Sequence, residues 1–504
     1  MAVFSEEGAF RGKLAVVSPL MVKPKPPCLP SFLGSPVADN YKDIKWLWPA
    51  NCNIEDLHKG EFLWHESRSC VATLNSARPL EEDDFLRTLR ILMKKCPHLR
   101  TCLRTRGDKL WFCQPPNLKM NFEVLRRDTM PREALLSALE NMLQFPDTAQ
   151  WSMRLAPQSE RVECLNPEVK ESHPHQYLLV FSGHHGMMDG IGAMFILNSL
   201  LDILNNHLEG RPTNDDEYAP FSEERELPAL LCEIREKLCQ DPTLMEAVKN
   251  NVPSPTRFPL FFQAFPPPSE VMEVTTKCVS GVVESEDSNV LMTKVKREGV
   301  TLNSALVAVI NVALMELVSE RGLLPDSYEV ASIITTTLRR YKKPSPTFIF
   351  GPCTGHMSYL STVDKGVRSR FWKYCKSVNE ELRNRFQQGA PLRERALQSL
   401  LSYGQEPHDY TIRVMPPLHD YTINNLGDFS SVFSAQEKNV VKLTSLTSNN
   451  MIHNTFHTTF HEILSFGGCH YYTLSYGTNY VSDDTAKLFL GRIFSVLREV
   501  IRLP

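Results

Sequence analysis

The sequence lacks the marks of several classes of protein. None of its thirteen cysteines forms a Cys-x-x-Cys pair, and the count is odd, which disfavours both a disulfide framework and a zinc ribbon. Free thiols fit a reducing compartment, so we expect a cytoplasmic protein. Charges of both signs are mixed along the chain, with a formal net charge of -3. No basic stripe is therefore present to bind nucleic acid or anionic lipid.

Long uninterrupted apolar runs are also missing. The stretch at residues 14–22 contains Pro19 and follows two acidic residues, which disfavours a signal peptide. The run at residues 305–318 contains Asn311 and Glu316 and is shorter than the ~18 residues that a membrane-spanning helix needs. We predict no transmembrane segment.

Length and composition indicate a folded chain with more than one core. Hydrophobic residues make up 42% of the sequence and charged residues 22%, close to the averages of globular proteins. At 504 residues the chain exceeds the size at which one core stops growing. Six prolines precede residue 41 and predict an extended arm there, and a polar stretch at 207–228 predicts a crossover. We expect an N-terminal arm (1–40), a first subdomain (41–206), a crossover linker (207–270) and a second subdomain (271–504).

Hydrophobic periodicity predicts alternating helices and strands. The expected elements are helices at 80–93, 191–204, 288–298, 301–317 and 487–501, strands at 176–182 and 330–337, and a hairpin at 456–476. The adjacent Gly467 and Gly468 provide the positive φ that a tight hairpin turn requires. An α/β fold follows, with sheets and helices packed on them.

Chemistry is concentrated in residues 184–190, between a predicted strand and a predicted helix. Loops in such positions often carry functional residues. Gly186 and Gly190 let the backbone turn tightly and approach a reactant. Asp189 precedes the helix, where it can cap free N–H groups or accept an ion pair.

His185 in this loop is suited to general-base catalysis. An imidazole has an ordinary pKa of ~6.5, so much of it is neutral at physiological pH and can take a proton from an attacking alcohol. A paired histidine in a loop is also compatible with a purely structural or surface role, because short spacings recur by chance in long proteins.

The spacing His184-His185-x-x-x-Asp189-Gly190 resembles the signature of the CoA-dependent acyltransferase superfamily, which includes chloramphenicol acetyltransferase and peptide-synthetase condensation domains. Two further segments match motifs of the family, and the three motifs stand in the family's order along the chain. Residues 96–101 are similar to its His-Pro-x-Leu-Arg-Thr segment, and residues 424–427 to the Ser-Asn-Leu-Gly segment of alcohol acetyltransferase-like members. The latter begins with Asn424 instead of Ser, and the plant-type Asp-Phe-Gly-Trp-Gly run is absent.

The resemblance assigns unequal roles to the first motif. His185 would be the general base and His184 a supporting residue. Asp189 would be structural, ion-paired to Arg100 and shaping the loop, although Arg100 could also be a surface arginine. Gly190 would keep the backbone clear of the thioester.

The resemblance also implies a fold and a reaction. Two chloramphenicol acetyltransferase-like subdomains, each with a mixed sheet and packed helices, would form a channel at their interface, with Asn425 and Gly427 beside it. A monomer would transfer an acyl group, acetyl among them, from acyl-CoA to a small alcohol or amine, with an ester favoured as product. Acyl-CoA would be a co-substrate, with no permanently bound cofactor and no metal.

Two other functions stay open. A condensation-type reaction would take its donor from a carrier protein, and a catalytically silent relative would bind without turnover. The basic run at 339–343 could meet CoA phosphates, but we expect a solvated loop. His453, His457 and His461 recur at every fourth residue, as zinc ligands on a helix would. Their neighbours indicate a strand, where they would stand ~13 Å apart and could not share one ion.

Overall fold

The computed structural model describes residues 43–503 apart from several short segments and single residues. Outside the description lie 51–66, 108, 117, 145–148, 160–166, 215, 219–225, 255, 270, 272–273, 324, 344–350, 404–416, 434–438 and 453–456. The predicted arm, residues 1–40, also lies outside the described residues. The chain divides into two units after Asp43, and every helix and strand of the described residues lies in the second, Ile44–Pro504.

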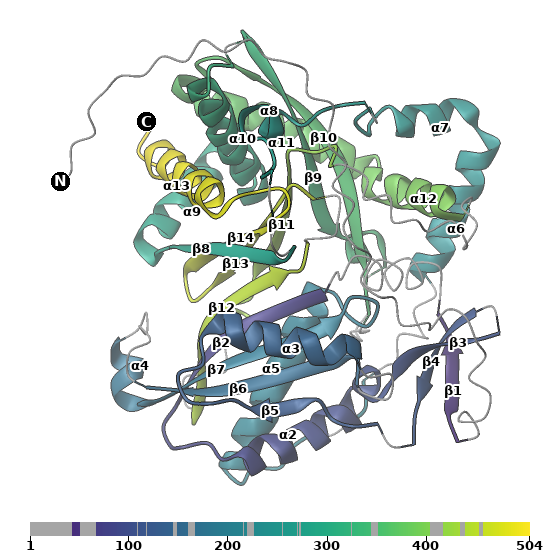
Figure 1. The fold of residues 1–504 in the computed structure, drawn as a ribbon, viewed down its shortest axis with the longest axis vertical. Coiled ribbons are helices and arrows are strands. Elements are labelled where there is room, and N and C mark those ends of the chain that lie inside the picture. The colour runs from purple at the N-terminus through teal and green to yellow at the C-terminus, as the bar shows by residue number, and fades with distance from the viewer. Residues whose placement is uncertain are drawn as a thin grey trace. The chain divides into compact units, whose positions relative to one another are not determined.

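The first sheet has five strands in the order β12-β2-β7-β6-β5. Their bounds are β2 Ser67–Ser76, β5 Phe122–Val124, β6 Trp151–Gln158, β7 His175–His184 and β12 Val441–Asn450. Neighbouring strands are antiparallel except β5 and β6. In Figure 1 the yellow-green β12 lies beside the purple β2. A strand from late in the sequence therefore completes the sheet that carries the histidine loop.

Helices pack on both faces of this sheet. Apolar side chains of α2 (Glu82–Lys95) and α5 (Gly190–Leu208) share a core with one face. On the other face α3 (Pro131–Gln144) packs Ala134 and Ala138 against apolar side chains of β6 and β7. The helices predicted at 80–93 and 191–204 and the strand predicted at 176–182 are confirmed.

The second sheet has six strands in the order β10-β9-β11-β13-β14-β8. Their bounds are β8 Thr276–Val283, β9 Ser327–Thr337, β10 Thr354–Asp364, β11 Tyr421–Asp428, β13 Thr459–Phe466 and β14 Cys469–Gly477. The β11 strand runs parallel to β9 and β13, and the other neighbours are antiparallel. The predicted α/β class with mixed sheets is confirmed.

Four long helices contribute to the core of this second sheet. They are α9 (Ser285–Glu298), α10 (Leu302–Glu320), α11 (Phe371–Gln387) and α13 (Asp483–Val500). By length and composition α10 is apolar enough to cross a membrane, but 78% of the relevant window is buried in the protein. Its apolar residues are explained by the core, where a helix is hydrophobic all round.

The predicted hairpin is confirmed by β13 and β14. Gly467 and Gly468 join the strands with φ of 59° and 79°. Both angles lie in the left-handed region, which suits the twist of a tight hairpin and which glycine adopts without a Cβ clash.

The remaining elements are further helices and a small third sheet. Helices α6 (Glu226–Gln240), α7 (Pro242–Lys249) and α8 (Leu260–Ala264) all fall within the predicted crossover, so part of this linker is helical. The α12 helix (Ala390–Tyr403) contacts α6, α7 and β10. A small sheet of β1 (Lys45–Pro49), β3 (Cys102–Arg106) and β4 (Lys109–Gln114), and the short α4 (Pro167–Ser172), complete the set.

Candidate active site

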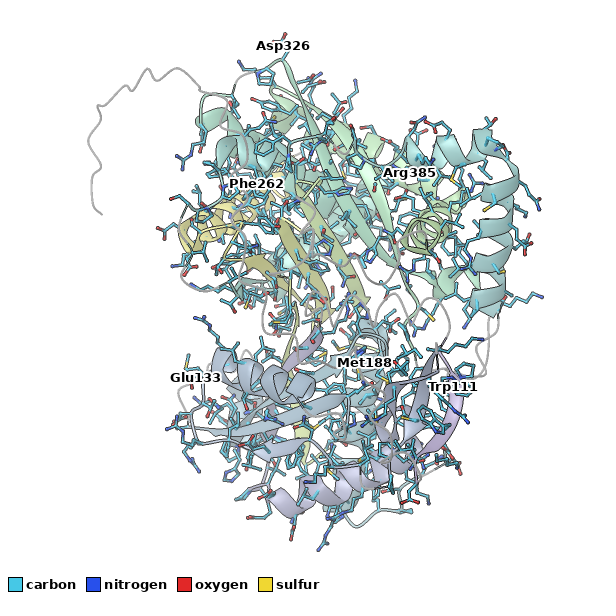
Figure 2. The ribbon with its side chains drawn as sticks, turned by 45° about the vertical axis from the view of Figure 1, so that its right-hand side comes forward. Trp111, Glu133, Met188, Phe262, Asp326 and Arg385 are labelled. Carbon is cyan, nitrogen blue, oxygen red and sulfur yellow. The ribbon has the colours of Figure 1, made fainter. Side chains whose placement is uncertain are left out.

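The loop from His184 to Gly190 joins the end of β7 to the start of α5. The Gly186 amide donates to Nδ1 of His184 at 2.9 Å, and the Met187 amide donates to the His184 carbonyl at 2.9 Å. A Cβ on Gly186 would lie 3.1 Å from the His184 ring, so the turn leaves little room there for a side chain. His184 thus closes the turn. Met188 of the same loop lies where the strands of the two sheets come together (Figure 2).

His185 is held in one tautomer by its two ring contacts. Nδ1 lies 3.2 Å from the Met188 carbonyl oxygen, which can only accept, so Nδ1 carries the proton. Nε2 is then the acceptor, and Nε of Arg68 donates to it at 3.1 Å. A neutral imidazole with its lone pair on Nε2 is the form that a general base needs.

Burial sets the protonation state of this imidazole. His185 is 7% exposed. Burial, and next the charge of Arg68, lower the pKa of His185 to about 3, although Asp189 and backbone contacts oppose the shift. Burial also lowers the pKa of His184 to about 3. Both rings are therefore neutral at physiological pH.

Asp189 uses both carboxylate oxygens to hold structure together. Oδ1 accepts the Gly192 amide at 2.9 Å and caps α5. Oδ2 accepts the Cys353 amide at 3.0 Å and forms an ion pair with Arg339. Burial would raise the pKa of Asp189, but Arg339 and the two amides lower it overall. The carboxylate therefore stays charged and ties the histidine loop to the chain between β9 and β10.

The predicted pairing of Arg100 with Asp189 is wrong. Arg100 ends a short 3-10 helix, η1 (Pro97–Arg100), and its Nη2 lies 2.5 Å from Oε1 of Glu217, with a third of the side chain exposed. Arg339 takes the expected place from another 3-10 helix, η3 (Leu338–Tyr341). The basic run was predicted to be a solvated loop, and for Arg339 this was also wrong, because its guanidinium is mostly buried against Asp189.

The second motif, residues 424–427, lies against the histidine loop across the interface of the two sheets. A Cβ on Gly190 would lie 2.7 Å from Cδ2 of Leu426. Asn425 accepts the Gly427 amide at 3.1 Å, and Gly427 has a φ of +95° that favours glycine. The structure therefore brings the end of β11 against the start of α5.

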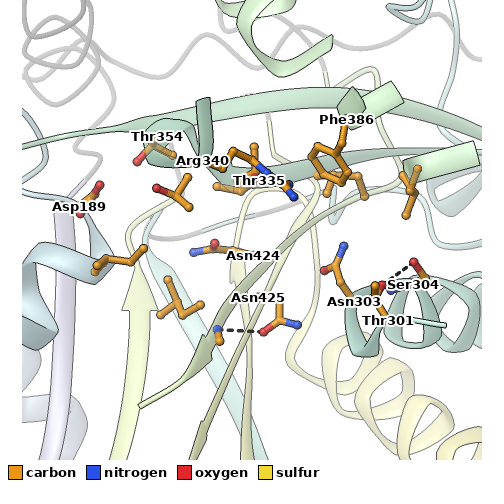
Figure 3. A pocket seen from close by; sticks show the side chains of 18 of the residues that line it. Asp189, Thr301, Asn303, Ser304, Thr335, Arg340, Thr354, Phe386, Asn424 and Asn425 are labelled. Carbon is orange, nitrogen blue, oxygen red and sulfur yellow. Dashed lines mark hydrogen bonds between the residues drawn. The ribbon is translucent and has the colours of Figure 1, made fainter. Parts of the chain in front are cut away.

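A pocket of ≈ 480 Å³ opens beside these residues. Figure 3 shows Asp189 at one end, Thr301, Ser304 and Phe386 at the other, and Asn424 between them. Arg68, Gly190, Asn425 and Gly427 also line the pocket. His185 is not among the residues that line it, and Arg68 is the lining residue that contacts His185.

Sequence reasoning missed Arg68 and Glu462. Arg68 Nη1 lies 3.1 Å from Oε1 of Glu462, and both side chains are buried. Glu462 also accepts Nδ2 of Asn424 at 3.0 Å and Nδ2 of Asn450 at 2.7 Å. The available signal was a single charged residue inside each of two otherwise buried strand sequences, since unpaired charges are rarely buried.

The zinc alternative gains no support from the described residues. His453 lies outside them. His457 shares a hydrogen bond with Thr422 at 2.7 Å, and His461 shares one with Tyr472 at 2.6 Å. His461 lies in β13, so the predicted strand is confirmed there. No group of three or more His, Cys, Asp or Glu side chains within the described parts of the chain is placed to hold a metal.

Solved acyltransferases and condensation domains share this fold at low sequence identity. The trichothecene 15-O-acetyltransferase of Fusarium sporotrichioides aligns over 90% of this chain and 95% of its own, with a TM-score of 0.61 and 13% identity. The condensation domain of the monacolin K polyketide synthase aligns over 91% and 99%, with a TM-score of 0.63 and 13% identity. Polyketide synthase associated protein 5 from Mycobacterium tuberculosis aligns over 91% and 99%, with a TM-score of 0.61 and 12% identity.

These similarities confirm the two-subdomain fold that the sequence motifs predicted. At such identities they establish the fold and leave the reaction open. No protein-family model and no curated protein matches the sequence.

Replacing Asp189 by Asn tests the structural role of this carboxylate. The amide keeps the cap on Gly192 but leaves the mostly buried Arg339 without its counter-charge. We expect the free energy of unfolding in urea to fall by ~3 kcal/mol, as for other broken buried pairs. Asp241→Asn is the matched control, because Asp241 caps α7 through two backbone amides at an exposed site. Equal losses in the two variants would contradict the role of the Arg339 pair.

Buried neutral histidines predict sensitivity to mild acid. Burial lowers the pKa of His184, His185, His356, His419 and His461 to about 3, whereas an unfolded histidine titrates near ~6.5. Below that pH the unfolded chain binds more protons, so stability is complete above ~6.5 and is lost as the pH falls towards 3, by up to ~1.4 kcal/mol per pH unit for each group. Urea unfolding measured from pH 8 to pH 5 checks this, and a constant unfolding free energy over that range would contradict it.

Proposed function

We propose that this protein transfers an acyl group from a CoA thioester to an alcohol, with His185 as the general base. One observation carries the proposal: the buried His185 is held as the neutral tautomer whose Nε2 accepts from Arg68, and Arg68 lines the pocket. An amine acceptor would use the same step. The acetyltransferase among the structural neighbours acts on an oxygen, which favours an alcohol.

The reaction needs only the chain's own side chains and the two substrates. Nε2 of His185 takes the proton of the acceptor hydroxyl while its oxygen attacks the thioester carbonyl. A C–O bond forms and the carbonyl electron pair moves to oxygen, giving a tetrahedral oxyanion. When this collapses, the C–S bond breaks and the leaving thiolate takes the proton from Nε2. The products are an ester and free CoA thiol.

Positive charge along the pocket supports an anionic donor. Arg340 and Arg383 line it, and within the described residues neither has a carboxylate partner. The guanidinium of Arg340 stacks on the Phe386 ring at 4.5 Å, which orients it. The N-terminus of α10, capped by Thr301, also lines the pocket, and helix N-termini favour anions.

The base assignment is tested by thiol release. Purified protein is incubated with a panel of acyl-CoAs and alcohols or amines, and free CoA thiol is followed. We expect His185→Gln to lose at least about 100-fold in rate, within the range for general-base removal. His175→Gln is the matched control, because His175 begins the same strand at its far end. Equal rates in wild type and His185→Gln would contradict the assignment and favour a silent relative.

The donor assignment is tested by the two pocket arginines. We expect Arg340→Gln and Arg383→Gln each to raise KM for acyl-CoA about tenfold, because a charge-assisted hydrogen bond contributes ~1.5 kcal/mol or more. The effect should shrink at high salt. Arg297→Gln serves as control, since Arg297 pairs with Glu298 on the surface.

A carrier-bound donor is the second candidate, because condensation domains share the fold. A carrier's phosphopantetheine arm presents a single phosphodiester, whereas CoA presents several phosphates. Turnover only with a carrier-loaded donor would overturn the CoA assignment and support this alternative. Unchanged KM for acyl-CoA in both arginine variants would contradict the role given to those side chains.

A further inference from the structure

Arg68 lines the pocket and contacts the proposed base, and it is firmly anchored. It lies at the start of β2, is 6% exposed, and donates through Nε to Nε2 of His185 at 3.1 Å. Its Nη1 lies 3.1 Å from Glu462 of β13. Glu462 in turn accepts from Asn424 of β11 and Asn450 of β12. Strands of both sheets therefore fix this guanidinium beside the base.

The contact with Arg68 occupies the lone pair that catalysis requires. A neutral imidazole has one acceptor nitrogen, and in the unliganded protein it accepts from Arg68. An acceptor hydroxyl can donate to Nε2 only by taking the place of the Arg68 N–H. Since Glu462 still holds Nη1 of Arg68, the displaced Nε–H stays next to the incoming oxygen and the carbon that it attacks.

Glycine at position 190 leaves the guanidinium accessible from the pocket. A Cβ there would lie 3.7 Å from Nη1 of Arg68, so a side chain would cover it. With Gly190, Arg68 lines the same pocket as the second motif. An acyl donor bound at this end of the pocket would therefore contact the charged guanidinium of Arg68, which lines the pocket, whereas His185 does not line it.

The charges around His185 favour a role for Arg68 in stabilising the anion that forms during the reaction. His185 is faced by Arg68 from β2, by Asp189 from its own loop and by His356 from β10. Protonating His185 beside Arg68 places two positive charges together, which is unfavourable without a nearby anion. The tetrahedral oxyanion supplies that negative charge at the same moment, and an N–H donor held in a dry site stabilises it strongly.

We propose that Arg68 is a second catalytic residue, which masks Nε2 of His185 in the empty site and donates to the oxyanion once the acceptor has displaced it. This inference rests on the proposed acyl transfer. The proton still passes from the acceptor to Nε2 and then to the thiolate, while Arg68 keeps all its protons and only changes its hydrogen-bond partner.

The kinetic test compares Arg68→Gln and Arg68→Lys with the wild type. We expect kcat to fall about 100-fold in Arg68→Gln, as when one oxyanion donor is removed, with KM for acyl-CoA within about twofold. Loss of the positive charge should move the acidic limb of kcat/KM to higher pH by about one unit. Arg68→Lys should retain the position of this limb but not the full kcat, because the charge remains and the Nε–H is lost.

Arg154→Gln is the matched control for loss of a buried arginine. Arg154 lies in β6 of the same sheet, is buried, and bonds to Asn121 and Ser137 away from the pocket. It should lose stability while kcat and the pH profile stay unchanged. A kcat for Arg68→Gln within threefold of the wild type, or a loss confined to KM, would overturn the catalytic role.

A second readout needs no turnover. Diethyl pyrocarbonate acylates unprotonated imidazole nitrogens, and mass spectrometry of the peptide containing His185 measures its rate in the unliganded full chain. We expect faster modification at His185 in Arg68→Gln and in Glu462→Gln than in the wild type, and no change in Arg154→Gln. An unchanged rate of His185 modification in both Arg68→Gln and Glu462→Gln would show that Arg68 does not shield Nε2, whatever the enzymatic activity of these variants. Full activity in His185→Gln would instead defeat the proposed function, so the two failures are distinguishable.

Discussion

The buried carboxylate of Asp189 is the constraint on which the site depends. One oxygen caps the helix that follows the histidine loop, and the other binds Arg339 and the Cys353 amide from the second half of the chain. A buried charge in this position needs such partners to offset the cost of its desolvation. One side chain therefore links the loop geometry, the start of α5 and the contact between the two halves.

Arg68 and Glu462 form a second connection of the same kind. It joins β2 of the first sheet to β13 of the second. Asn450 also donates to Glu462 from β12, the strand from late in the sequence that pairs with β2. Buried ion pairs contribute little net stability compared with apolar packing, but they are costly to break on one side. Two such pairs near His185 therefore fix the relative position of groups that hydrophobic packing alone would allow to shift.

Much of the fold could be predicted from the sequence, because it depends on local periodicity. The strand before His184, the helix after Asp189 and the glycine turn at Gly467 follow from patterns within a few residues of each position. The place of the histidine loop, between a strand and a helix, was accessible for the same reason. Contacts between residues far apart in the sequence could not be predicted in this way. Arg100 follows a helix much as Arg339 follows a strand, and only the packed structure shows which of them reaches Asp189.

The same limit explains why Arg68 was missed. In the sequence it stands alone, far from His185 and farther still from Glu462, and its strand gives no periodic hint of a ligand. Its meaning comes from three strands meeting at one point. That arrangement also resolves a difficulty in using a deeply buried base. Burial lowers the pKa of His185 to about 3 and makes it a poor proton acceptor by itself. Proton transfer to such a nitrogen becomes favourable only together with an anion forming beside it. In the proposed reaction, the site would therefore favour proton loss from an acceptor that is attacking a carbonyl over simple ionisation of that acceptor.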